Sequence, residues 1–127
     1  AKYYVWPKIC NLPDPEWLEE FTFDGAVNHG PGRAIMFIQE VINAFGIKVV
    51  AVDGGLGPMT TAAVISTQGR VGEWRFCAGC YEERKQFYYY LIQNEGPDDP
   101  DKKWIAGWLN RLAEFHTPAI AEYTEAR

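Results

Sequence analysis

Several features that commonly reveal an activity are scarce in this chain of 127 residues. It holds a single serine, Ser66, without a Gly-x-Ser-x-Gly turn around it, so a serine-hydrolase nucleophile is not indicated. No apolar run approaches the roughly 18 residues that a membrane-spanning helix needs. Positive charge is also in short supply, because 12 Lys and Arg face 17 Asp and Glu for a net charge of −5. This balance argues against non-specific binding to nucleic acid or to an anionic bilayer.

Cysteine is equally sparse. Cys10, Cys77 and Cys80 make an odd count, which does not favour a disulfide framework. Cys77 and Cys80 have the spacing of redox and zinc sites, but a structural zinc needs four ligands, and the two histidines lie far away in sequence. We therefore expect buried or half-buried thiols on a helix, and we predict no metal site and no cofactor.

Apolar residues are plentiful. Hydrophobic residues make up 47% of the chain and aromatic residues 15%, which is enough for the core of one domain over residues 1–127. Large apolar side chains crowd the first six residues, at Tyr3, Tyr4, Val5 and Trp6, where chains are usually poorly ordered. They resemble the end of an element that begins elsewhere. We therefore expect this chain to be the C-terminal part of a longer protein.

Helix start and stop signals predict a compact, mainly α domain of about five helices. Asp14 as cap and Pro15 in the first turn begin the first helix, and Gly30 stops it. The other helices are predicted over residues 33–45, 58–68, 71–94 and 104–115, with Gly69 as the stop of the third. Pro118 should bend or restart the last helix, and the tail beyond it should fray. The β-branched residues 47–52 make at most a short strand.

The segment Val52–Val64 combines an apolar approach, a glycine-rich turn and a helix start. Asp53 and Gly54 favour a tight turn, Gly57 suits the N-cap, and Pro58 suits the first helical position. One interpretation is a structural corner. The other is a docking loop, since the helix start offers free backbone donors to a polar ligand. Nucleotide binding is not indicated, because the Gly-Lys-Ser/Thr ending of a phosphate loop is missing.

A first polar group lies at the end of the first helix. Asp24 and Asn28 share one helix face because they are four residues apart. His29 follows them, and a helix C-terminus raises the pKa of a nearby histidine, so we expect His29 to titrate near neutrality. The group is either a histidine beside a capping asparagine or the polar floor of a cleft.

A second group lies on the last helix. Trp104 and Trp108 share a face and are predicted to stack along it, whereas Asn110 and Arg111 point elsewhere. Tryptophan rings pair with sugar faces, and Asn and Arg bind hydroxyls and carboxylates. The alternative interpretation is that the tryptophans belong to the core and that Arg111 is a surface residue.

Four segments in order resemble phage and prophage muramidases of glycoside hydrolase family 108, including their C-terminal peptidoglycan-binding region. The matching segments are Phe23–Ala34, Val52–Val64, Arg84–Tyr88 and Gly107–Arg111. The resemblance implies a lysozyme-like helical fold and a glycosidase that acts on peptidoglycan glycan strands as an endolysin or secretion activator. It also implies synthesis in the cytoplasm, action at the cell wall or periplasm, and passage through a holin or secretion system.

The resemblance also suggests roles for single residues. Asp24, Asn28 and His29 would line the cleft, Gln39 would follow a hydrophobic residue at the end of the second helix, and Asp53 and Thr60 would hold the corner or touch the glycan. Trp108, Asn110 and Arg111 would brace the fold or form the cleft wall. The family's catalytic glutamate lies in a Glu-Gly-Gly-Tyr motif that this chain does not contain, so we expect the proton donor upstream and name no catalytic residue here.

Two other interpretations stay open beside a muramidase fragment. One is a non-catalytic module that binds peptidoglycan or assists secretion, as the missing glutamate motif allows. The other is an unrelated helical interaction domain, because a fold by itself does not determine function.

Overall fold

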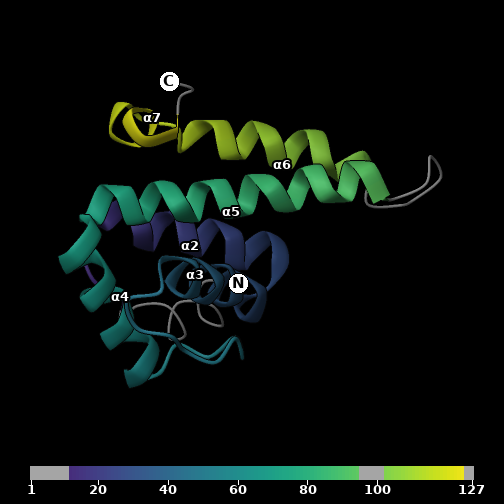
Figure 1. Cartoon of the computed structure of the whole chain (residues 1–127). Helices are drawn as coiled ribbons and strands as arrows, with labels where there is room; N and C mark the ends of the chain where they lie inside the picture. Colours follow the sequence, from purple (N-terminus) through teal and green to yellow (C-terminus); the bar gives the residue numbers. More distant parts are fainter. Residues whose placement is uncertain (1–11, 95–101, 125–127) are drawn as a thin grey trace.

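The computed structural model describes residues 12–94 and 102–124, and this part of the chain contains six helices and no strand (Figure 1). The prediction of a mainly α fold is therefore confirmed. The helices are α2 (Glu16–His29), α3 (Pro31–Phe45), α4 (Pro58–Val71), α5 (Glu73–Asn94), α6 (Lys102–Glu114) and α7 (Pro118–Thr124). The sixth helix, α7, is the one that Pro118 begins.

Helix α5 is the central element of the arrangement. Helices α2, α3 and α4 lie on one side of it and α6 and α7 on the other (Figure 1). Its inner stripe is Phe76, Cys80, Arg84 and Tyr88, which are four residues apart and at most 1% exposed. An arginine within such a stripe requires a buried acidic partner.

The cysteines of α5 are buried thiols, as expected. Cys77 and Cys80 are both free, and burial raises the pKa of Cys77 to about 12 and that of Cys80 well above its ordinary value. Gly79 lies between them, and a Cβ at this position would approach Val41 of α3 to 3.0 Å. The missing side chain therefore lets α3 and α5 pack closely. Cys10 lies outside the described residues.

The predicted boundary between the third and fourth helices was wrong. Gly69 continues α4, which runs to Val71, and Gly72 separates α4 from α5. Gly72 has φ +96°, a conformation that favours glycine, and its N–H donates to the Gln68 carbonyl over 2.8 Å. Gly69 was predicted as the stop and Gly72 was placed inside the next helix, but of the two only Gly72 has a positive φ.

Two predictions about helix ends were also wrong. Asp14 does not cap α2, because the helix begins after Pro15 without any side-chain cap, and Glu16 and Glu19 supply negative charge to its first turn instead. The tail does not fray over residues 118–124, because α7 packs on α5 and Ile120 is fully buried. Residues 125–127 lie outside the described part.

Residues 47–52 form no strand with any described segment. The side-chain amide of Asn43 binds both backbone groups of Val50, with Nδ2 donating to the carbonyl and Oδ1 accepting from the N–H, each over 2.8 Å. One asparagine on α3 therefore satisfies the backbone groups that a second strand would otherwise satisfy.

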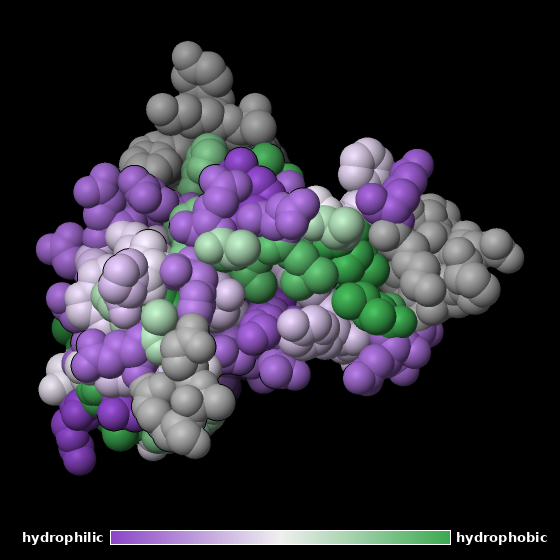
Figure 2. Space-filling model, turned by 90° about the horizontal axis from the view of Figure 1, so that it is seen from above, coloured by the Kyte–Doolittle hydropathy of each residue, from purple (hydrophilic) through white to green (hydrophobic). Residues whose placement is uncertain are grey.

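None of the helices in the described ranges is long and apolar enough to cross a membrane. The face seen from above Figure 1 carries a band of hydrophobic residues between hydrophilic ones (Figure 2). Such a mixed surface is ordinary for a folded domain, so a functional site must be argued from particular side chains.

Candidate functional site

Asp24 binds two arginines that are distant in sequence. It is 5% exposed on α2, and its carboxylate oxygens accept hydrogen bonds from Arg84 of α5 and from Arg111 of α6. Arg84 is 1% exposed and also donates from Nη1 to the carbonyl of Phe21 over 3.2 Å. This triad of Asp24, Arg84 and Arg111 ties three helices together.

The triad keeps Asp24 ionised. Burial alone would raise the pKa of Asp24, but the hydrogen bonds and charges of Arg84 and Arg111 outweigh burial and hold that pKa below its ordinary value. Asp24 therefore cannot serve as a proton donor near neutral pH. Asn28 completes the arrangement, since its Nδ2 donates to the Asp24 backbone carbonyl over 3.0 Å and to Oδ2 over 3.3 Å.

His29 lies in an aromatic cluster next to the triad. Its Nε2 is 2.7 Å from the Tyr88 hydroxyl, and its ring is 4.7 Å from the ring of Trp108 between centroids. Tyr88 and Trp108 stack at 5.7 Å. Because Arg84 Nε also donates to the Tyr88 hydroxyl over 2.8 Å, the cluster and the triad form one continuous network.

The prediction that His29 titrates near neutrality was wrong. Burial and the positive charge of Arg84 lower its pKa from 6.5 to about 4, so the ring is neutral at pH 7. The Tyr88 oxygen already accepts from Arg84, and Tyr88 is fully buried. The Tyr88 hydroxyl therefore donates its hydrogen bond to Nε2 of His29, and the ring proton of the neutral His29 lies on Nδ1.

Gln39, Asp53 and Thr60 meet in a second network. Gln39 is fully buried on α3, and its Oε1 accepts from the N–H groups of Asp53 and Gly54 over 3.0 and 2.9 Å. Its Nε2 lies 3.0 to 3.1 Å from Asp53 Oδ1, the Gly55 carbonyl and Thr60 Oγ1. Hydrogen bonds from the Gly55 N–H and from Gln39 lower the pKa of Asp53. The buried side chain of Gln39 thus holds the turn from its inner side, whereas Asp53 itself is exposed.

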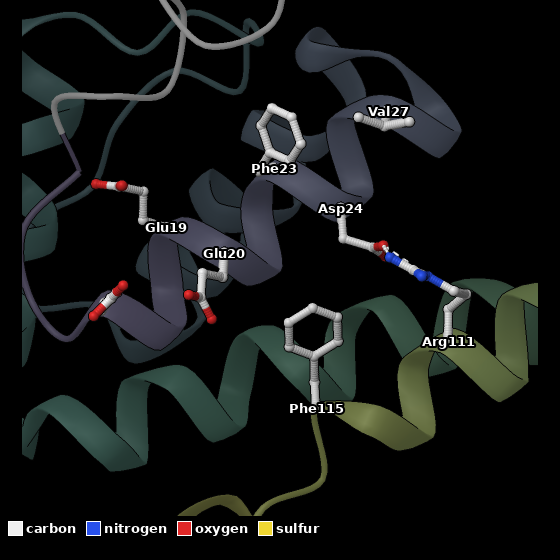
Figure 3. A pocket seen from close by; sticks show the side chains of 8 residues that line it. Glu19, Glu20, Phe23, Asp24, Val27, Arg111 and Phe115 are labelled. Atoms are coloured by element: carbon white, nitrogen blue, oxygen red, sulfur yellow. Dashed lines mark hydrogen bonds and ion pairs between the residues drawn. The ribbon is translucent and has the colours of Figure 1, made fainter. Parts of the chain in front are cut away.

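An open groove of about 540 Å³ runs along α2, with the end of α6 opposite (Figure 3). Its lining residues are Glu16, Glu19, Glu20, Phe23, Asp24, Val27, Arg111 and Phe115. The glutamates occupy the first two turns of α2, and Phe23, Val27 and the Asp24–Arg111 ion pair occupy the next two. We call this site the α2–α6 groove. It can hold a ligand that combines an apolar face with hydrogen-bonding groups.

The remaining predicted residues lie around these features. Trp104 is 55% exposed and has no stacking contact with Trp108 among the described ring pairs; the cation of Lys103 lies 5.2 Å from its ring instead. Asn110 is exposed on α6. Arg111 is 56% exposed, yet its Nε and Nη2 both bind Asp24. A binding role for any of these residues stays a prediction.

Sequence reasoning assigned no role to Arg84 and Tyr88, although both belong to the segment Arg84–Tyr88 that it singled out. The available signal was the four-residue spacing that places Arg84 on the same stripe as Phe76 and Cys80. The sequence analysis also assigned no binding role to the glutamates of the groove. In the described ranges, no three His, Cys, Asp or Glu side chains are arranged to hold a metal ion.

Comparison with known proteins gives a match to a family model. A family model described as a predicted peptidoglycan domain matches residues 33–113, nearly two-thirds of the chain. No curated protein and no solved structure matches the chain, so the resemblance to lysozymes stays a prediction. The matched span contains Gln39, Asp53, Thr60, Arg84, Tyr88, Trp108 and Arg111. The chain therefore belongs to the predicted peptidoglycan domain family.

Proposed function

We propose that the chain holds peptidoglycan at the cell wall for a hydrolase of the N-acetylmuramidase type, and that the α2–α6 groove receives the glycan strand. The family supports peptidoglycan as the target. The groove supports this location, because it places apolar side chains beside hydrogen-bonding groups. A sugar ring needs both, since its faces are apolar and its rim carries hydroxyl groups.

The observation that carries the location is the exposure of apolar side chains in the groove. Val27 is 49% exposed although it follows the buried residues of α2, and Phe23 lines the groove beside it (Figure 3). Asp24 and Arg111 lie at the same end and present a fixed ion pair to a bound hydroxyl. Gln39, Asp53 and Thr60 do not line this groove, and their proposed part is structural, since Gln39 fixes the Asp53 turn against Thr60 of α4.

The hydrolytic step is assigned to a group outside these residues. Asp24 is held ionised between two arginines, and Glu16 and Glu20 are exposed, whereas a general acid needs a sheltered site that raises its pKa. A secretion system or a holin is proposed only as the route to the wall. The alternative proposal is a non-catalytic module. It differs from the first proposal only in that the protein binds peptidoglycan without cleaving it.

Pull-down on purified sacculi tests this proposal. We expect the wild-type chain to be retained and Val27→Asp to bind about tenfold more weakly, because a charge replaces an apolar contact. Ile65→Asp is the matched control, since Ile65 is 55% exposed on α4, outside the groove. If the sacculi do not retain the wild-type chain, the proposed function is overturned. Equal binding of Val27→Asp and the wild type would overturn the location.

A further inference from the structure

We infer that the acidic end of the α2–α6 groove binds the free side-chain amino group of a peptidoglycan stem peptide. This inference rests on the proposed function and deepens it, because it names the part of peptidoglycan that this end of the groove selects. Stem peptides carry a diamino acid whose side-chain amine is protonated at neutral pH and free wherever no cross-link has formed.

The charge along the groove is the first part of the argument. Glu16, Glu19 and Glu20 line its first half, and Glu16 and Glu20 are exposed (Figure 3). The only cation that lines the groove within the described residues is Arg111, and its Nε and Nη2 both donate to Asp24. The first half of the groove, which the glutamates line, is therefore anionic. It repels the carboxylates of a stem peptide and attracts its ammonium group.

The walls of the groove are the second part. Phe115 lies across from α2, at the end of α6, on the side of α2 to which Glu20 points (Figure 3). An alkyl chain that ends in an ammonium group fits such a wall, because its methylene groups pack on the ring while its charge reaches the carboxylates. The glycan proposed above would occupy the other end, beside Phe23 and Val27. The two halves of the groove then match the two parts of one ligand.

Helix stability does not account for all three glutamates. Glu16 and Glu19 lie in the first turn of α2, where negative charge favours the helix dipole, and α2 has no side-chain cap. Glu20 lies beyond that turn. It is therefore the best residue for a test, since its substitution should change ligand binding more than helix stability.

The test compares two forms of the same sacculi, one untreated and one in which acetic anhydride has acetylated the free amines. Acetylation removes the positive charge and leaves the glycan strands intact. We expect the wild-type chain to bind untreated sacculi about five- to tenfold more tightly than acetylated ones at low salt, and the preference to shrink as salt rises. Glu20→Gln should lose most of this preference and match the wild type on acetylated sacculi.

Glu40→Gln is the charge-matched control, because Glu40 is exposed on α3 and does not line the groove. It should keep the wild-type preference. Equal binding of the wild type to both kinds of sacculi would overturn the inference and leave the proposed function standing, as would an unchanged preference in Glu20→Gln. Binding to neither kind would overturn the proposed function, and the inference with it.

Discussion

At the scale of single residues, the triad of Asp24, Arg84 and Arg111 is the place where we expect substitutions to change the free energy of unfolding most. Asp24→Asn removes the negative charge but keeps the shape of the side chain, so Arg84 becomes a buried cation without a counter-ion. We expect a loss of about 3–5 kcal/mol in the free energy of unfolding, measured by urea denaturation.

Arg111→Gln is the matched comparison. It removes the exposed partner and leaves the Asp24–Arg84 pair in place, so it should cost about 1 kcal/mol or less. Equal losses in the two variants would show that the burial of Arg84 does not decide the energetics.

The neutral state of His29 predicts a pH dependence. Its pKa is about 4 in the folded state and 6.5 when unperturbed, so below pH 6.5 the unfolded chain takes up a proton that the folded chain does not. The free energy of unfolding should therefore fall as the pH drops from about 6.5 to about 4. The loss should be about 1–2 kcal/mol, because the ring is partly exposed.

Urea denaturation at a series of pH values checks this. The curve of His29→Gln should be flatter than that of the wild type over the same range, and the difference between the two curves isolates the contribution of His29. The lowered pKa of Asp24 places its effect at more acidic pH, so it does not mimic the effect of His29. Parallel curves would contradict the assignment.

At the scale of helices and turns, Gly69 and Gly72 offer a paired test. Gly72→Ala forces a side chain into φ +96° and should cost about 1–2 kcal/mol. Gly69→Ala lies within α4 with no neighbouring atom within 4 Å of its added Cβ, so it should gain about 0.5–1 kcal/mol from helix propensity.

Thermal unfolding of both variants measures the difference. The reverse order of stability would mean that the helix ends at Gly69, as the sequence predicts, and not at Gly72.

The same pair shows what local sequence could predict and what it could not. Proline and glycine marked the start of α4 at Pro58 and the end of α2 at Gly30, because their backbone preferences act locally. They did not identify which glycine ends α4, since Gly69 was predicted as the stop and Gly72 was placed inside the next helix. The conformation of residues 47–52 depends on Asn43, which replaces a partner strand.

The site was less predictable than the helices. Asp24, Asn28 and His29 were singled out because they are neighbours on one helix. Their partners Arg84 and Tyr88 lie about 60 residues away, and helical spacing carries no information across that distance. The low pKa of His29 follows from those distant partners, whereas its place near a helix end indicated the opposite direction.

At the scale of the whole molecule, the central position of α5 predicts a pattern of hydrogen exchange. The backbone amides around Phe76–Tyr88 should exchange most slowly, because this stretch packs against helices on both sides. Amides of residues 55–57 in the turn, beyond the two that donate to the buried Gln39, should exchange at least about a hundredfold faster, since opening them leaves the core intact.

Exchange followed by mass spectrometry after proteolysis resolves these segments. Slower exchange in α2 and α3 than in α5 would show that the first two helices, and not α5, form the most stable unit.

The sequence separations within the triad bear on biosynthesis. Asp24 is translated 60 residues before Arg84 and 87 residues before Arg111. While the ribosome makes α3 and α4, this acid has neither counter-ion and remains in water. The carboxylate can be buried at low cost only once α5 has emerged, and α6 can be attached to α2 only after Arg111 has been made. The three helices can therefore join only after the intervening helices α3 and α4 have been synthesised.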